Sequence, residues 1–118
     1  IVEGLLSLKL LKGSKEEVID KGLYSKFYMH RIGHWLGMDV HDVGSYKQDG
    51  DWRALEKGMV MTVEPGIYIL NSLEDVDDKW KGIGVRIEDD ILITDTGFEV
   101  LTPNVPRTID EVEQAVKG

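Results

Sequence analysis

The stretch from Tyr28 to Gly44 constrains this chain most, because it holds all three histidines of the protein, interspersed with glycines. The histidines are His30, His34 and His41. Glycine lets a backbone turn tightly or pass close to another group, and imidazoles near acidic side chains are typical of metal and acid–base sites. The stretch therefore indicates either such a site or a buried helix whose histidines are incidental.

Other kinds of site do not fit the spacing. His30 and His34 lie four residues apart, as in the helical zinc-peptidase motif His-Glu-x-x-His, but Arg31 stands where that motif has glutamate. Gly33 and Gly37 also weaken a helix here. The chain has no serine in a sharp, glycine-flanked elbow and no glycine-rich phosphate loop. A serine triad and a phosphate-binding loop are therefore not indicated.

A carboxylate stands at the end of a predicted strand further along the chain. Met59 to Val63 reads as a strand that runs into Glu64-Pro65-Gly66, and a second strand is predicted from Ile67 to Leu70. Proline and glycine force a turn between them. The backbone would then hold the Glu64 side chain rigidly, either as a functional group or as an acceptor for the amides of the turn.

A third stretch, Val85 to Thr94, alternates charged and apolar residues as one strand with period two. Arg86, Glu88 and Asp90 would share one face of it. Three charges on one face are costly to bury unless they are paired or bound to metal, and an arginine can orient a carboxylate through paired hydrogen bonds. The alternative is a solvated edge strand whose charges oppose aggregation.

The sequence outside these three stretches predicts helices, strands and loops with a structural role. Helical spacing of apolar residues, capping signals and short apolar runs give these elements: a helix over Ile1–Leu11, a capped helix from Ser14 to about Asp20, a short strand over Phe27–Met29 that delivers His30, a loop over Ser45–Lys57 with Trp52 on the surface, an exposed acidic loop over Asn71–Gly82, a strand over Phe98–Leu101, and a helix capped by Thr108 that runs from Ile109 to about Val116.

Composition limits the partners. At 118 residues the chain is one domain or less, and its formal charge of −8 argues against a nucleic-acid partner. Because there is no cysteine, any metal must take nitrogen and oxygen ligands, which suit manganese, cobalt, iron or zinc. No apolar run reaches the ~20 residues that span a bilayer, and no signal peptide is visible. We therefore expect a cytoplasmic protein without a membrane partner.

Three motifs in a fixed order carry a family resemblance: His34-Trp-Leu-Gly-Met-Asp-Val-His41-Asp-Val-Gly, Val63-Glu64-Pro-Gly66, and Gly84-Val-Arg86-Ile-Glu88-Asp-Asp90. The chain closely resembles the pita-bread metallopeptidases, and among them the Xaa-Pro aminopeptidases. The resemblance implies an α+β fold over residues 1–118. These residues would form the C-terminal half of a pita-bread (creatinase/aminopeptidase-like) catalytic domain, an antiparallel sheet with flanking helices.

The resemblance also implies a cofactor and roles for single residues. The family uses two divalent metal ions, usually Mn2+, bridged by water or hydroxide, with Co2+, Zn2+ or Fe2+ as alternatives. His34, Glu64 and Glu88 match the metal ligands, with Glu88 bridging both ions and Glu64 also accepting a proton. His30 and His41 match the histidines that contact the substrate carbonyl and the tetrahedral intermediate. Arg86 matches an arginine that orients the metal-binding carboxylates.

Two further ligands of the family, both aspartates from the preceding half of the domain, have no match here. Asp39, Asp42, Asp49 and Asp51 all follow His34 and lie outside the predicted strands. We therefore expect a fragment with three of five ligands, which binds metal weakly and is inactive alone. Its expected partners are the missing N-terminal half, peptides with proline in second position, and further copies of itself as a homo-oligomer.

Alternative functions stay open at this point. Xaa-Pro dipeptidase (prolidase) shares the same ligands, whereas methionine aminopeptidase lacks the pattern around Arg86. A non-catalytic pita-bread module that has lost its metals is a different class of protein. The joint presence of His34, Glu64 and Glu88 argues against that class, because a binding module does not need all three.

Overall fold

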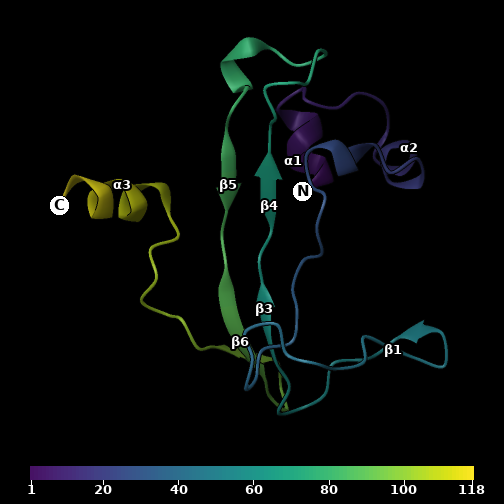
Figure 1. Cartoon of the computed structure of the whole chain (residues 1–118), viewed down its shortest axis with the longest axis vertical. Helices are drawn as coiled ribbons and strands as arrows, with labels where there is room; N and C mark the ends of the chain where they lie inside the picture. Colours follow the sequence, from purple (N-terminus) through teal and green to yellow (C-terminus); the bar gives the residue numbers. More distant parts are fainter. The chain divides into compact units, whose positions relative to one another are not determined.

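The computed structural model describes residues 1–118, and it divides into two compact units. Unit 1 comprises Ile1–Arg31 and Pro65–Arg86, and unit 2 comprises Ile32–Glu64 and Ile87–Gly118. Each unit is therefore built from two separate stretches of sequence (Figure 1). None of the helices has the length and hydrophobicity that crossing a bilayer requires.

Unit 1 contains the hydrophobic core. Its elements are α1 (Val2–Ser7), α2 (Lys15–Asp20), the 3-10 helices η1 (Leu23–Lys26) and η2 (Asp78–Trp80), and the antiparallel pair β4 (Gly66–Tyr68) and β5 (Gly84–Arg86). Helix α2 begins at Ser14, whose side chain accepts a hydrogen bond from the Glu17 amide, as the capping signal predicts. The buried apolar side chains all belong to this unit: Leu5, Leu10, Leu11, Val18, Phe27, Ile69 and Val76.

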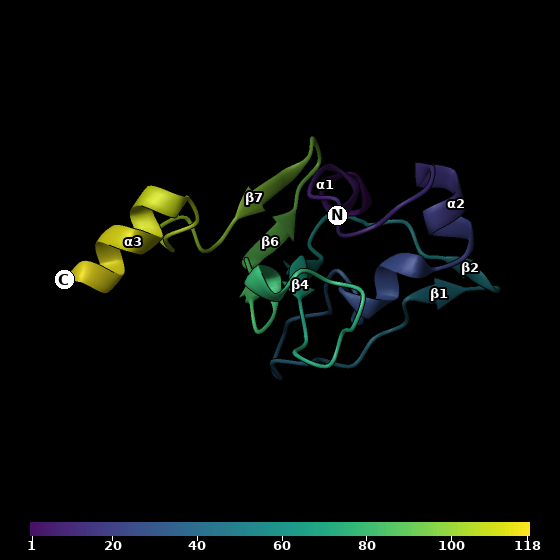
Figure 2. The same cartoon turned by 90° about the horizontal axis from the view of Figure 1, so that it is seen from above.

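Unit 2 is organised around an antiparallel sheet with the strand order β3-β6-β7. These strands are β3 (Val60–Val63), β6 (Asp89–Ile93) and β7 (Phe98–Val100), and Figure 2 shows the hairpin of β6 and β7. Residues 32–36 run along the free edge of β3. Backbone N–H groups of Leu36, Thr62 and Glu64 donate across this edge to carbonyl oxygens of Val60, His34 and Ile32, at 2.7–3.1 Å.

Two smaller elements complete unit 2. Strands β1 (Lys47–Gln48) and β2 (Asp51–Trp52) form a hairpin whose turn, Asp49-Gly50, has two positive φ angles, 53° and 94°, as type I′ turns require. Helix α3 (Ile109–Lys117) begins with the capping box of Thr108 and Glu111 and stands apart from β6 and β7 (Figures 1 and 2). A salt bridge of 3.1 Å from Arg107 to Asp89 joins the segment before α3 to the start of β6.

Several predicted elements are wrong. The stretch around the histidines contains no helix, so the buried-helix interpretation fails. Phe27–Met29 is not a strand, because η1 precedes it and the Phe27 side chain is fully buried in the core. The first helix ends at Ser7 rather than Leu11, since Lys9 adopts a left-handed φ of 59° and the chain turns Leu10 and Leu11 into the core.

Three further predictions, one of a strand and two of loops, need correction. Val85–Thr94 is not one strand, because β5 ends at Arg86 and β6 begins at Asp89, so the proposed face of three charges is not continuous. The loop predicted over Ser45–Lys57 contains the β1–β2 hairpin, which places Asp51 in a strand. The acidic stretch 71–82 includes η2 and a buried Val76. Trp52 lies on the surface as predicted, with 68% of it exposed.

Candidate metal centre

Strand register brings three predicted ligands of unit 2 to one place. His34 lies opposite Thr62 on β3, and Glu64 follows two residues later, on the same side of the strand. On the other side of β3, Val63 pairs with Asp89, so the same register continued by one residue places Glu88 opposite Glu64. Side chains of directly opposite residues lie on the same face of a sheet. One ligand atom from each of His34, Glu64 and Glu88 falls within 4.8 Å of the others.

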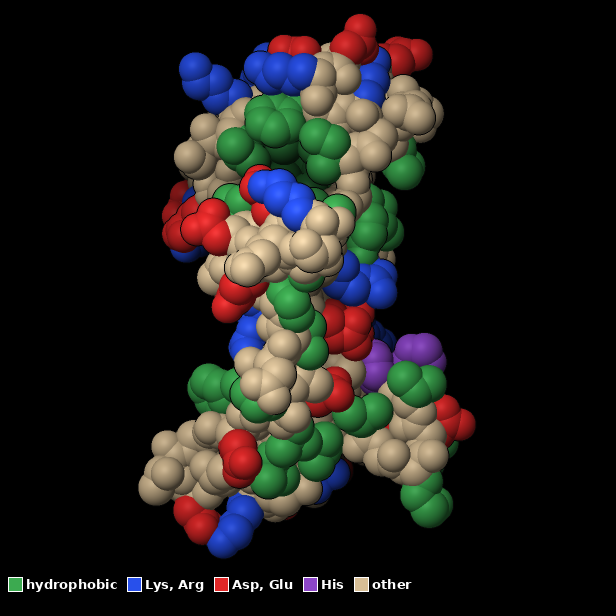
Figure 3. All heavy atoms as spheres, turned by 90° about the vertical axis from the view of Figure 1, so that its left-hand side faces the viewer, with side chains coloured by type: hydrophobic (Ala, Val, Ile, Leu, Met, Phe, Trp, Pro, Cys, Tyr) green, Lys and Arg blue, Asp and Glu red, His purple; other side chains and the backbone are tan.

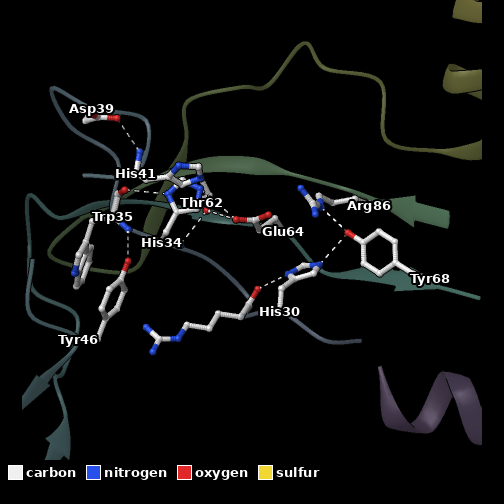
Figure 4. Close-up of polar contacts among 11 residues, drawn as sticks. His30, His34, Trp35, Asp39, His41, Tyr46, Thr62, Glu64, Tyr68 and Arg86 are labelled. Carbon is white, nitrogen blue, oxygen red and sulfur yellow. Dashed lines mark hydrogen bonds and ion pairs between the residues drawn. The ribbon is translucent and has the colours of Figure 1, made fainter. Parts of the chain in front are cut away.

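The imidazole of His34 is held in one tautomer. Its Nδ1 lies 3.0 Å from the carbonyl oxygen of Trp35, which can only accept, so Nδ1 carries a proton. In the neutral ring Nε2 then presents a lone pair, 3.3 Å from Oε1 of Glu64 (Figure 4). Two acceptor atoms at this distance repel each other unless a proton or a metal ion lies between them. A metal-binding histidine is commonly oriented in this way.

The carboxylates create a local excess of negative charge. Glu64 is only 8% exposed, and its Oε1 accepts a hydrogen bond of 3.1 Å from the Thr62 hydroxyl. Like charges directly opposite each other in a sheet destabilise it, and partial burial of Glu64 strengthens that repulsion. One imidazole and two carboxylates form a donor set that manganese, iron, cobalt or zinc would accept. The residues present therefore fit a divalent metal ion.

His41 lies beside this cluster. Its ring centroid is 4.5 Å from that of His34, in an edge-to-face arrangement, and the residue is exposed. The loop that carries it is held by side chains: the His41 amide donates to Asp39, and Asp42 accepts from the amides of Met38 and Val43. Figure 3 shows histidine side chains at the molecular surface. His41 is thus placed where a ligand of the centre could reach it.

The other two predicted catalytic residues, His30 and Arg86, belong to a cluster of side chains in unit 1. Nε of Arg86 donates to the Tyr68 hydroxyl at 2.7 Å, and that hydroxyl lies 2.9 Å from Nε2 of His30. Nδ1 of His30 donates to the Arg31 carbonyl oxygen at 2.7 Å. Since Nδ1 holds the proton of the neutral ring, the Tyr68 hydroxyl donates to Nε2 (Figure 4). Arg86, Tyr68 and His30 therefore form one directed chain of hydrogen bonds.

Two residues of these clusters, Thr62 and Tyr68, were not predicted from the sequence. Thr62 carried a usable signal, because it precedes Glu64 by two positions on a predicted strand and so shares its face. Tyr68 carried no comparable signal in the sequence. The prediction that the glycines allow close approach is confirmed at Gly33, where a Cβ would collide with the carbonyl oxygen of Thr62.

Comparison with known proteins assigns the family. Residues 7–95 match the model of Metallopeptidase family M24, so the chain belongs to metallopeptidase family M24. It is 55% identical to a Xaa-Pro aminopeptidase of Haemophilus influenzae over 111 residues, which are 94% of this chain and 25% of the relative. It is 37% identical to the Xaa-Pro dipeptidase of Homo sapiens over 145 residues, covering 99% of this chain and 29% of that protein.

Solved structures agree with this assignment. Aminopeptidase PepP of Pseudomonas aeruginosa matches with a TM-score of 0.94 and 57% identity, over 99% of this chain and 26% of that one. Aminopeptidase P of Escherichia coli with the inhibitor Pro-Leu matches with a TM-score of 0.87 and 51% identity, over 96% and 25%. The prediction of an α+β chain that forms part of a pita-bread fold is confirmed. The chain spans about a quarter of the length of the relatives it matches.

Proposed function

We propose that this chain forms part of the active site of a metal-dependent aminopeptidase that removes the N-terminal residue from peptides with proline in second position. The observation that supports this most directly is the convergence of His34, Glu64 and Glu88 in a chain so similar to Xaa-Pro aminopeptidases. These three residues would hold divalent metal, with Mn2+ as the favoured metal. Such ions supply Lewis-acid activation of water for peptide hydrolysis.

The reaction adds water across the Xaa–Pro amide bond. The carbon–nitrogen bond breaks, the hydroxyl goes to the carbonyl carbon of Xaa, and a proton goes to the proline nitrogen. Within this chain, Glu64 would accept the proton that water loses, because its carboxylate is held rigidly at the end of β3. His41 would donate a hydrogen bond to the substrate carbonyl as negative charge develops on its oxygen.

His30 and Arg86 have supporting roles in this proposal. The Arg31 carbonyl oxygen fixes the tautomer of His30, and the Tyr68 hydroxyl, which accepts from Arg86, helps to orient the ring. His30 would contact the substrate carbonyl, and Arg86 would orient the metal-binding carboxylates. Both roles rest on the match between the sequence motifs and the family.

The chain supplies three of the five ligands that the family uses, so we propose that residues 1–118 form the C-terminal part of a catalytic domain. The remaining two ligands would come from the preceding part of the polypeptide. Alone, the chain would bind metal weakly and hydrolyse nothing. Light scattering of the full-length polypeptide tests the proposed homo-oligomer, and the cytoplasmic location stays a prediction.

Substrate length tests the proposed activity. The full-length polypeptide that contains this chain, and the chain alone, are assayed with Mn2+ on an Ala-Pro-Ala tripeptide and an Ala-Pro dipeptide. We expect the full-length protein to release alanine preferentially from the tripeptide, EDTA to abolish this, and the chain alone to be inactive. Preference for the dipeptide would favour the Xaa-Pro dipeptidase alternative, whose human member is 37% identical. Absence of hydrolysis of either peptide would favour a non-catalytic module.

A further inference from the structure

One buried side chain contacts two of the three candidate ligands. Thr62 is 2% exposed and lies in the middle of β3, between the edge segment that carries His34 and the strand end that carries Glu64. Its hydroxyl oxygen accepts a hydrogen bond of 3.0 Å from the backbone amide of His34. The same hydroxyl donates a bond of 3.1 Å to Oε1 of Glu64 (Figure 4).

The pairing of Thr62 with His34 departs from an ordinary ladder. In an antiparallel ladder, the two residues of a hydrogen-bonded pair exchange two backbone hydrogen bonds. Here the Thr62 amide donates to the His34 carbonyl oxygen at 2.9 Å, as expected, but the His34 amide donates to the Thr62 hydroxyl. The side chain thus takes the place of a backbone acceptor. A hydroxyl has one proton, and it goes to Glu64, so both bonds have a defined direction.

The residue type supports a role for the hydroxyl itself. Valine has nearly the shape of threonine and suits a buried strand position, where it avoids the cost of burying a hydroxyl. The neighbours of Thr62 on β3 are the apolar residues Val60, Met61 and Val63. The two bonds to His34 and Glu64 offset the cost of burying this hydroxyl. Valine could make neither bond.

We infer that Thr62 is a positioning residue that fixes His34 and Glu64 relative to each other before metal binds. This inference rests on the proposed function, because it assumes that both residues are metal ligands. One atom, Oγ1, holds the backbone of His34 and the carboxylate of Glu64, and the Trp35 carbonyl orients the imidazole ring. Loss of such an outer hydrogen-bond partner typically weakens metal affinity by about 10- to 100-fold.

The test compares the hydroxyl with its closest replacements in the full-length polypeptide. Thr62→Val removes the hydroxyl and keeps the shape of the side chain, whereas Thr62→Ser keeps the hydroxyl. Thr94→Val is the control, because it removes a threonine hydroxyl elsewhere in unit 2. Mn2+ titration by calorimetry should give a Kd raised by about 10- to 100-fold for Thr62→Val. The Kd should be essentially unchanged for Thr62→Ser and Thr94→Val. Without metal, hydrogen exchange at the His34 amide should accelerate only in Thr62→Val.

The outcomes separate this inference from the proposed function. If the wild-type protein binds no Mn2+, the proposed function is wrong and the inference falls with it. If the wild type binds Mn2+ and a folded Thr62→Val binds it equally well, the positioning role is wrong. If Thr62→Val does not fold, Thr62→Ser and Thr62→Ala give the same comparison with a smaller side chain. Equal Kd values for that pair would overturn the inference.

Discussion

At the scale of single residues, the closeness of Glu64 and Glu88 predicts that one substitution raises stability without metal and weakens metal binding. Glu88→Gln removes one of two facing negative charges, so without metal it should raise the free energy of unfolding by about 0.2–1 kcal/mol. With Mn2+, the same change removes a ligand and should weaken binding. Urea unfolding of the full-length polypeptide with and without this change, each in EDTA and in Mn2+, measures both effects. A variant that is less stable in EDTA would contradict the placement of the two carboxylates.

Gly33 should tolerate no side chain. A Cβ there would meet the carbonyl oxygen of Thr62, so Gly33→Ala must push the His34 segment away from β3. We expect a loss of about 1–3 kcal/mol in stability, as for other overpacked sites, together with weaker Mn2+ binding. Gly4→Ala is the matched control, because nothing lies within 4 Å of a Cβ at Gly4 in α1. That change should stabilise the chain by about 0.5–1 kcal/mol.

The candidate ligands could be named from the sequence only through the family motifs. Physical pattern reading placed Glu64 at the end of a strand, where the structure has it. It could not place His34 opposite Thr62, because residues 32–36 show no alternation of apolar and polar side chains and pair with β3 through backbone bonds. It also could not see the break between Arg86 and Asp89. Such pairings depend on contacts distant in sequence.

At the scale of elements, helix α3 should respond to acid through its cap. The backbone N–H groups of Thr108 and Arg107 donate to the Glu111 carboxylate and lower its pKa from 4.5 to about 2. Since the folded pKa is depressed, this stabilisation is complete above pH 4.5 and is lost as the pH falls towards 2. Amide chemical shifts of Thr108 and Arg107 should titrate with a midpoint near pH 2, the pKa of the folded state. Glu111→Gln should abolish the titration, and its persistence would contradict the assignment.

Elements with local signals were predictable, and those without them were not. The caps at Ser14 and Thr108 define the starts of α2 and α3, because a cap and its partner lie within one turn. The turn of the β1–β2 hairpin, Asp49-Gly50, carried a local signal for a hairpin, although only a loop was predicted there. The end of α1 depended on burial of Leu10 and Leu11, which a local pattern does not specify.

At the scale of the whole molecule, the two units differ in how well they bury apolar side chains. All seven buried hydrophobic residues belong to unit 1. In unit 2 the strand side chains of β6 are only half-buried, and Met38, Val43 and Phe98 are largely exposed. Figure 3 shows hydrophobic side chains open at the surface. A chain that spans a quarter of its relatives is expected to leave such surface uncovered.

This difference predicts unequal local stability. Backbone amides exchange slowly where opening requires unfolding of a packed core. In the chain alone, amides of Val18 and Ile69 in unit 1 should therefore exchange with solvent more slowly than those of Thr62 and Ile91 in unit 2. Hydrogen exchange followed by NMR measures this residue by residue. Equal protection in both units would show that unit 2 is stabilised by something other than apolar burial.

The most direct test of the metal centre is a count of bound Mn2+ by equilibrium dialysis and elemental analysis. The full-length polypeptide should hold about two ions per chain, and residues 1–118 alone should hold nearly none at the same free Mn2+ concentration. Changing His34, Glu64 and Glu88 together to alanine should remove binding from the full-length polypeptide. Two tightly held ions in residues 1–118 would contradict the split of ligands between this chain and preceding residues. Unchanged binding in the triple variant would contradict the site itself.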